Sequence, residues 1–153
     1  MLMSNQRAQW ADGQAILNWS WFGTVVFCVA AIPATIWPSW FQWPFMAVSM
    51  GMFLAGTVLL AWALWIAVQR SRYFVVGIGG LFFTVGSAPG QVQKILLSSL
   101  CIEVVVGFLA ATLRIYTPVT FGILAPVWAL GLTSLWCARF GSFEVRQNDQ
   151  RNG

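Results

Sequence analysis

The chain has 153 residues, of which 59% are hydrophobic and only 8% are charged, and its formal net charge is +4. Soluble globular domains carry charge on about a quarter of their residues, and disordered chains are poor in hydrophobic residues. The composition therefore excludes both classes and predicts a single transmembrane domain, residues 1–153, with an all-α fold of four spanning helices. Ten Trp and twelve Phe fit this class, because aromatic side chains gather at the two membrane interfaces.

The chain begins with a polar segment, residues 1–18, which we expect to form a tail or a short interfacial helix. A first spanning helix is predicted over residues 19–37, because these 19 residues carry no charged side chain and about 20 apolar residues cross a bilayer as helix. A cleaved signal peptide is the alternative for this region. The long polar lead with Asp12 argues against it, since signal peptides combine a basic start with an apolar core.

Residues 37–44, WPSWFQWP, form an uncharged link in which two prolines disfavour helix. Its three tryptophans predict an anchor at the membrane interface, and a patch that stacks on carbohydrate is the alternative. The second spanning helix is predicted over residues 45–68. Gly51 and Ala55 lie one turn apart on it and predict a helix-packing face, because small residues let helix backbones approach in lipid.

Residues 74–86 are hydrophobic, but 13 residues are too few to cross a bilayer comfortably as helix. Gly77, Gly79 and Gly80 also weaken a helix here. We therefore predict an interfacial or re-entrant segment, with a short fifth span as the alternative. The glycine run does not match a phosphate-binding loop, because it lacks both the GxGxxG spacing and the Gly-Lys-Ser/Thr ending.

The third spanning helix is predicted over residues 94–114 and holds a single acidic side chain, Glu103, close to its middle. A carboxyl group at this depth costs a few kcal/mol, so the helix needs a side that is protected from lipid. At about 100° per residue, three small residues share the direction of Glu103. They predict the helix-packing face of this span: Ser99, Gly107 and Ala110.

The fourth spanning helix is predicted over residues 118–138. It opens with Pro118, whose missing backbone donor costs nothing in the first turn of a helix. Pro126 is expected to kink the helix near mid-depth, because proline removes a backbone hydrogen bond inside a helix. Residues 139–153 then form a polar tail.

A polar layer is expected at mid-depth. The third and fourth spans are joined by a short link, so they should be antiparallel neighbours, with Trp128 at the depth of Glu103. Thr57 and Cys28 lie near the middles of the other two spans. An indole N–H and a threonine hydroxyl are donors that a buried carboxyl requires. The sequence therefore predicts an intramembrane polar site of Glu103, Thr57 and Trp128, with Cys28 beside it.

Three roles remain open for Glu103. The first is a protonated carboxyl bonded to a neighbouring helix. The second is a site for a proton, an ion or a ligand, and the third is a contact with another subunit. Arg114 is about 16 Å away along the helix axis, and Lys94 points to the opposite face. No basic side chain is therefore expected to pair with Glu103 inside the membrane, and we expect the carboxyl to be neutral.

The basic residues are distributed unevenly about the four predicted spans. With both termini on one side, that side holds seven of the eight Lys and Arg residues, and the other side holds only Arg114. Because basic residues favour the cytoplasmic side, we expect a multi-pass protein of the plasma membrane with both termini in the cytoplasm. Seven of the ten tryptophans, Trp136 among them, fall near the predicted interfaces. This distribution explains the basic charge without a nucleic-acid partner.

The sequence offers little catalytic chemistry. It has no histidine, and each of its cysteines, Cys28, Cys101 and Cys137, stands alone in an apolar run. Haem, copper and zinc sites commonly use imidazole, so we expect no metal and no cofactor, and we expect the cysteines to be buried thiols. There is also no carboxylate pair and no GxSxG motif. These features predict that the protein is not an enzyme.

Two functions follow as expectations. The first is an accessory or assembly subunit of a larger membrane complex, whose partners are the lipid bilayer and other membrane subunits or further copies of this chain. The alternative is a small-solute or proton-coupled transporter that uses Glu103. The faces suited to close helix packing favour the first, and the buried acid favours the second.

The C-terminal part carries a further pattern, SAPGQVQK followed downstream by FGILAPVWALGLTSLWCARFGSFEVR. It resembles a family of small actinobacterial membrane proteins, whose last helix is interrupted by proline and runs into a GLxxLWxARxGxF ending. The residues that match this ending are Gly131, Leu132, Leu135, Trp136, Ala138, Arg139, Gly141 and Phe143. The resemblance covers about a third of the chain. It implies a bacterial plasma membrane and no particular activity.

Overall fold

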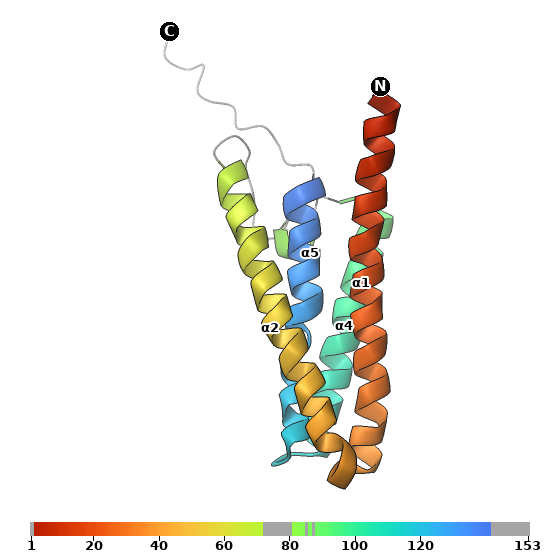
Figure 1. The fold of residues 1–153 in the computed structure, drawn as a ribbon, viewed down its shortest axis with the longest axis vertical. Coiled ribbons are helices and arrows are strands. Elements are labelled where there is room, and N and C mark those ends of the chain that lie inside the picture. The colour runs from red at the N-terminus through yellow and green to blue at the C-terminus, as the bar shows by residue number, and fades with distance from the viewer. Residues whose placement is uncertain (1, 72–80, 85, 87, 142–153) are drawn as a thin grey trace.

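Four long helical segments run alternately up and down the bundle (Figure 1). The computed structural model describes residues 2–71, 81–84, 86 and 88–141. Its elements are α1 (Leu2–Ile36), α2 (Pro38–Arg70), α4 (Gly90–Leu113), the 3-10 helix η1 (Pro118–Leu124) and α5 (Val127–Phe140). This part of the chain contains no strand, so the predicted all-α fold is confirmed. α1 begins and α5 ends at the same end of the bundle.

The outer surface identifies the environment of the bundle. Large apolar side chains such as Trp19, Val58 and Phe108 are more than half exposed. In water such a surface is unfavourable, whereas lipid accepts it. Four segments are long and apolar enough to cross a membrane: Gly13–Ile36, Pro38–Arg70, Gly90–Leu113 and Pro118–Phe140. The chain is therefore a multi-pass membrane protein.

Helices α1 and α2 are longer than predicted. α1 begins at Leu2, so the polar segment 1–18 is not a separate tail or interfacial helix: its described part is continuous with the first span. α2 begins at Pro38, so residues 37–44 do not form a link, and only Trp37 separates the two helices. The prediction treated these prolines as helix breakers. Pro38 stands in the first turn, where a missing backbone donor is harmless.

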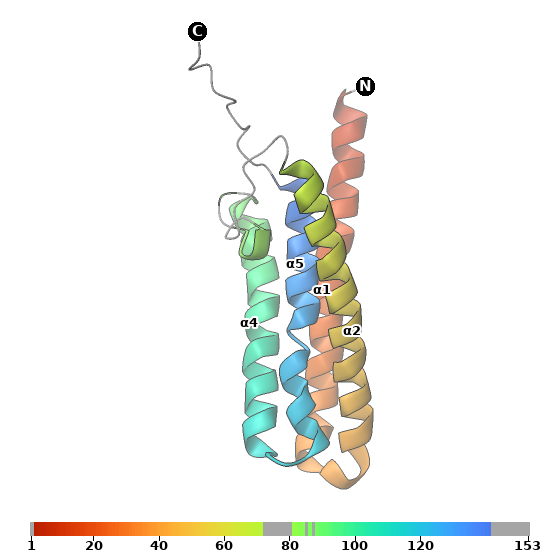
Figure 2. The same cartoon turned by 90° about the vertical axis from the view of Figure 1, so that its left-hand side faces the viewer.

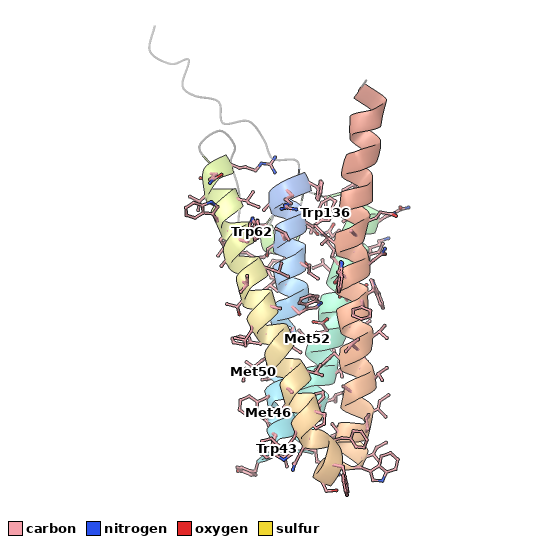
Figure 3. The ribbon with its side chains drawn as sticks, viewed as in Figure 1. Trp43, Met46, Met50, Met52, Trp62 and Trp136 are labelled. Atoms are coloured by element: carbon pink, nitrogen blue, oxygen red, sulfur yellow. The ribbon has the colours of Figure 1, made fainter. Side chains whose placement is uncertain are left out.

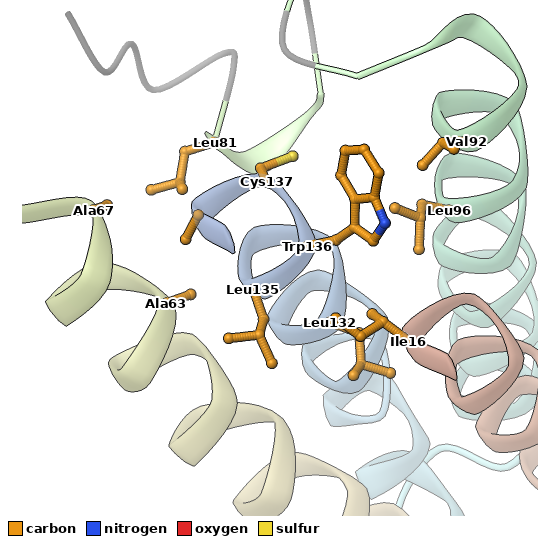
Figure 4. Packing of buried hydrophobic residues seen from close by; sticks show 11 residues of the cluster. Ile16, Ala63, Ala67, Leu81, Val92, Leu96, Leu132, Leu135, Trp136 and Cys137 are labelled. Carbon is orange, nitrogen blue, oxygen red and sulfur yellow. The ribbon is translucent and has the colours of Figure 1, made fainter. Parts of the chain in front are cut away.

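Most of the segment 74–86 lies outside the described residues, so its interfacial or re-entrant placement stays a prediction. Its described residues 81–84 include two buried side chains, Leu81 and Thr84. Leu81 packs into the same apolar cluster as Ala67 of α2 and Cys137 of α5 (Figure 4).

The fourth span is interrupted, whereas a single kinked helix over 118–138 was predicted. η1 ends at Leu124, and α5 begins at Val127 with Pro126 as its N-cap residue. Pro126 has no backbone N–H to donate to the carbonyl oxygen of Gly122, and the α-helical hydrogen bonds break here, whereas α1 and α2 continue past Pro33 and Pro44. α5 therefore begins inside the bundle, where its first backbone N–H groups have no partner in their own helix.

α5 is the centre of the bundle. In its span 61% of the apolar window is buried, against 28%, 22% and 33% in the other three. Every residue from 131 to 138 is buried. Figure 2 shows α5 between α4 on one side and α1 and α2 on the other. A helix enclosed in this way needs apolar or small residues on all of its faces, and α5 has them.

Two glycines bring the backbones of α2 and α5 into contact. A Cβ on Gly56 would lie 2.5 Å from the carbonyl oxygen of Val127, and a Cβ on Gly131 would lie 2.5 Å from the carbonyl oxygen of Gly56. Both distances are far below van der Waals contact, so the two helices can pack this closely only with glycine at both positions. Because Val127 is the first residue of α5, this contact also holds the start of α5 in place.

An apolar cluster fills the end of the bundle at which α1 begins and α5 ends. Trp136 lies within it, 5% exposed, and its indole is directed toward Val92 and Leu96 of α4 (Figure 4). Ile16 of α1 belongs to the same cluster. The prediction that Trp136 lies near a membrane interface concerns its depth and stays a prediction. The structure shows that the side chain is buried at that depth, because α1 and α4 cover the central helix on which it stands.

Two arginines bind backbone carbonyls at opposite ends of the bundle. Arg114 donates from Nε and Nη2 to the carbonyl oxygen of Thr35, at 3.1 and 2.8 Å. Arg70 donates from Nη1 to the carbonyl oxygen of Ala138 at 2.7 Å. Thr35 and Ala138 stand in the last turns of α1 and α5. Each guanidinium therefore donates to a carbonyl oxygen in the last turn of another helix. Such carbonyls lack a donor in their own helix and lie at the negative end of its dipole.

We expect Gly56→Ala to destabilise the bundle by about 1–3 kcal/mol, because the added methyl group overlaps the backbone of α5. Gly51→Ala is the matched control on the same helix, since a Cβ there meets nothing within 4 Å. Alanine also favours helix over glycine, so this variant should be at least as stable as the parent. Thermal unfolding in mild detergent measures both. Equal stabilities of the two variants would contradict the close α2–α5 contact.

Candidate functional site

The carboxyl group of Glu103 lies inside the bundle with no exposed surface. It stands on the buried face of α4, together with Ser99 one turn before it and Gly107 and Ala110 after it. Gly107 makes the closest approach: a Cβ there would lie 2.7 Å from the carbonyl oxygen of Gly122 in η1. The structure thus places Glu103 and the three residues of the predicted packing face on one buried side of α4.

Three hydroxyl groups connect Glu103 to α1. Thr24 donates from Oγ1 to Glu103 Oε1 at 2.8 Å, and the same Oγ1 lies 2.9 Å from Ser99 Oγ. Ser99 Oγ in turn lies 2.7 Å from Ser20 Oγ. Ser20 and Thr24 are one turn apart on α1, and all four side chains are buried. We name Ser20, Ser99 and Thr24 the hydroxyl chain.

The hydroxyl chain can be hydrogen-bonded in two opposite directions, because each hydroxyl has one hydrogen and two acceptor lone pairs. With an ionised Glu103, Ser20 donates to Ser99, Ser99 to Thr24, and Thr24 to the carboxylate. With a protonated Glu103, the carboxyl donates to Thr24. Thr24 can then donate to Ser99 or to the carbonyl oxygen of Ser20, 3.0 Å away. Either atom can be the donor in the Ser20–Ser99 and Thr24–Ser99 pairs, so the same oxygen positions serve both directions.

The carboxyl group of Glu103 also lies near the start of α5. Glu103 Oε2 has no hydrogen-bond partner of ordinary geometry, although the backbone N–H of Ala129 interacts with the carboxyl group. Ala129 is the third residue of α5, and such N–H groups have no carbonyl partner in their own helix. The N-terminal end of a helix dipole also favours negative charge. The interruption at Pro126 therefore points the positive end of a helix at a buried carboxyl.

Trp128 lies beside this site without bonding to it. Its Nε1 is buried and has no hydrogen-bond partner. The indole rests against Gly23 of α1, so closely that a Cβ at Gly23 would overlap its nitrogen. Gly23 and Thr24 are adjacent on α1, so Trp128 lies at about the depth of the hydroxyl chain. The sequence predicted Trp128 as a donor to Glu103, and the structure shows it as a neighbour of the site instead.

The prediction that Thr57 lies beside Glu103 is wrong. Thr57 is exposed on α2, and its Oγ1 donates to the carbonyl oxygen of Phe53 in its own helix at 2.7 Å. The buried side of α2, which includes Gly56, lies about 100° away around the helix. A position at mid-span indicates depth in the membrane, but it does not indicate which way a side chain points. Gly51 and Ala55 also face outward, so none of the described helices packs on that face.

Ser20 and Thr24 were missed, although the sequence contains a signal for them. Ser20, Thr24 and Cys28 recur every four residues along the first span, as Ser99 and Glu103 do along the third. Polar pairs of the same spacing on two apolar spans predict facing stripes, since residues four apart share a helix face. Cys28 is half-buried and close enough to Glu103 to interact with it electrostatically.

The described residues do not favour a metal centre. They contain no group of three or more His, Cys, Asp and Glu side chains that could hold an ion. Among the cysteines, Cys137 is buried, but Cys101 is exposed on α4, so the prediction that all three are buried is wrong. The oxygen atoms around Glu103 are hydrogen-bonded to one another, and the positive end of α5 faces them. A cation at this place would be repelled by that helix end.

These features define a multi-pass α-helical membrane protein whose fourth span is interrupted beside a buried carboxyl–hydroxyl cluster. Comparisons with protein-family models, with curated proteins and with solved structures find no match to the chain. The resemblance of its C-terminal part to small actinobacterial membrane proteins stays a prediction.

We expect Thr24→Val to destabilise the protein by about 1 kcal/mol, because it removes the donor to Glu103 and leaves buried acceptors unpaired. Thr57→Val is the matched control: the same change at an exposed position should cost no more than about 0.5 kcal/mol. Unfolding of both variants in the same detergent gives the comparison. An equal loss at the two positions would show that the Thr24–Glu103 hydrogen bond contributes nothing specific.

Proposed function

We propose that this protein is a non-catalytic accessory subunit, which binds a transmembrane helix of another membrane protein through the outer face of α2. The observation that carries this proposal is a row of three small residues, Ala47, Gly51 and Ala55, all exposed on that face. They are spaced one helical turn apart. This is the spacing with which small residues let two helices approach closely in lipid, where packing drives association.

The outer face of α2 is open along this row. Nothing lies within 4 Å of a Cβ placed on Gly51. Figure 3 shows Met46 and Met50 projecting from α2 away from α1; they lie about 140° and 100° around the helix from Gly51 and so flank the row and are not part of it. Leu54 and Val58 are 58% and 63% exposed. These larger side chains give a second helix apolar surface to pack on, and the small residues let the two backbones come together.

Charge at one end of this face favours another protein over a second copy of the chain. The guanidinium of Arg139 lies over the ring of Trp62, 5.9 Å from its centroid. Trp62 is exposed, and it points in nearly the same direction from α2 as Gly51, within about 20° around the helix. In a membrane two copies have the same orientation, so pairing through this face would bring two Arg139 groups together. A partner helix with an acidic side chain at this end would be attracted instead.

The chemistry of the interior supports a non-catalytic role. Acid–base and nucleophilic catalysis need at least two cooperating groups with access to a substrate. The chain has no histidine, and the hydroxyls nearest to Glu103 are bonded to it or to one another. The transporter alternative would have to act through Glu103, which packs away from the outer face of α2.

The proposal places this subunit in a bacterial plasma membrane with both termini in the cytoplasm. Arg70, Lys94 and Arg139 stand at the end of the bundle where α1 begins and α5 ends, and Arg114 stands at the other end. Basic residues are retained on the cytoplasmic side during insertion. The basic end of the bundle is therefore the cytoplasmic end in this proposal.

Single-cysteine labelling tests the orientation, in a background where Cys28, Cys101 and Cys137 are replaced by alanine. Ser39 and Gln69 are both exposed and stand at opposite ends of α2. A membrane-impermeant maleimide should label Ser39→Cys in intact cells, and it should label Gln69→Cys only after the membrane is permeabilised. The reverse pattern would contradict the cytoplasmic placement of the termini.

Gly51→Ile tests the partner face. A Cβ at this position meets nothing within 4 Å, so the bundle should fold as before, but an approaching helix could no longer reach the α2 backbone. The measured quantity is the recovery of a protein that co-purifies with the parent in mild detergent. With Gly51→Ile we expect this recovery to fall by about tenfold or more, which corresponds to the loss of one good packing contact. Quantitative mass spectrometry of the purified complex is the measurement.

Ala15→Ile is the control for this experiment. Ala15 is exposed on α1, so the same added side chain stands outside the outer face of α2. The partner should remain bound to this variant. Retention of the partner by Gly51→Ile, loss with both variants, or a parent that purifies alone or only with copies of itself would each overturn the proposal.

A further inference from the structure

We propose that the hydroxyl chain of Ser20, Ser99 and Thr24 relays protons between Glu103 and the end of the bundle at which α1 begins and α5 ends. The observation is the continuous contact of four buried oxygen-bearing side chains from two helices. Their successive oxygen–oxygen distances are 2.8, 2.9 and 2.7 Å. Each is an ordinary hydrogen-bond length for hydroxyl groups, so one proton shift per contact carries charge along the whole chain. The relay does not depend on the accessory role, because it lies inside the bundle.

The transfer balances when water is the external proton donor. A hydronium ion gives a proton to Ser20 Oγ, which passes its own hydrogen to Ser99 Oγ. Ser99 passes its hydrogen to Thr24 Oγ1, and Thr24 passes its hydrogen to Glu103 Oε1. Every hydroxyl keeps one hydrogen, the carboxylate becomes a carboxylic acid, and the direction of all hydrogen bonds is reversed. Release of the proton to water runs through the same contacts backwards.

The surroundings of Glu103 suit a group that alternates between two protonation states. The ionised form is stabilised by the donor Thr24 and by the N–H of Ala129 at the start of α5. The protonated form keeps a hydrogen bond, because Thr24 can turn to other acceptors. A buried acid that serves only as a structural donor needs acceptors alone, and a helix N-terminus directed at it would be a disadvantage.

Few other charged or titratable groups face Glu103. On α1 the nearest is Cys28, one turn beyond Thr24. The basic side chains described on α2, α4 and α5 stand at the ends of those helices, as the contacts of Arg70 and Arg114 with backbone carbonyls show. η1 has no charged residue. Protonation of Glu103 is therefore governed by the hydroxyl chain, the start of α5 and access of water.

An apolar seal closes the relay at the end that Ser20 forms. Ile16 lies one turn beyond Ser20, and Leu96 lies one turn beyond Ser99, and both pack in the cluster that contains Trp136. Trp136 Nε1 is buried there without a hydrogen-bond partner, so its N–H can donate to a water molecule that enters the seal. Proton exchange with bulk water should therefore be limited by brief hydration of this seal, and Leu96→Ala should accelerate it.

Infrared difference spectroscopy of the purified full chain in lipid nanodiscs tests the relay. The carbonyl stretch of a protonated Glu103 is assigned by its absence in Glu103→Gln, and its decay and return are followed after pH jumps in both directions. We expect a reversible band in the parent and an exchange that is slower by about tenfold or more in Thr24→Val, which breaks the path. Thr24→Ser, which keeps the hydroxyl, should restore the parent rate to within about threefold. Thr57→Val should leave the rate unchanged.

Three results would overturn the relay. One is a Glu103 band that stays constant across the pH range in folded protein, which would make the residue a permanently protonated structural acid. Another is parental exchange in Thr24→Val, which would mean that water reaches Glu103 by another route. The third is equal slowing in Thr24→Val and Thr24→Ser, which would point to packing and not to the hydroxyl. If Thr24→Val does not fold, Ser99→Ala interrupts the next contact and carries the same expectations.

Discussion

Glu103 places a carboxyl group among four apolar spans, where the surrounding chain must supply the hydrogen bonds that water would otherwise provide. That requirement explains why Ser20 and Thr24 face inward on α1, and why α1 packs beside α4 with their polar pairs in register. An unsatisfied carboxyl at this depth would cost several kcal/mol. The Thr24–Glu103 hydrogen bond thus fixes both the rotation and the relative height of two helices that are otherwise apolar.

The interruption at Pro126 adds the second half of this arrangement. A continuous fourth helix would present only side chains to Glu103, because its backbone donors would all be used internally. The start of α5 instead presents an N–H group and the positive end of a helix dipole. Gly56 and Gly131 hold this helix end against α2 at backbone distance. Irregular backbone is tolerated at such depth only where protein surrounds it, which is the case for the most buried span of the bundle.

The two proposed activities use different parts of the molecule. The row Ala47, Gly51 and Ala55 faces outward from α2, whereas Glu103 and the hydroxyl chain lie between α1, α4 and α5. A partner that binds on α2 would contact the same helix whose Gly56 packs against the start of α5. The two sites are thus distinct, but they share α5 as a common neighbour.

Composition and the spacing of apolar runs determined that this chain crosses a membrane as four helices, because a bilayer demands a particular length of uncharged helix. The periodicity around Glu103 also determined the buried face of α4, since residues three and four apart share one side of a helix. The partners of Glu103 were decided by the tertiary structure. Thr57 and Thr24 are both threonines inside apolar spans, and only the packing of α1 and α2 around α5 turns one inward and the other outward. A single sequence specifies depth along each helix, whereas the rotation of one helix against another depends on contacts between distant residues.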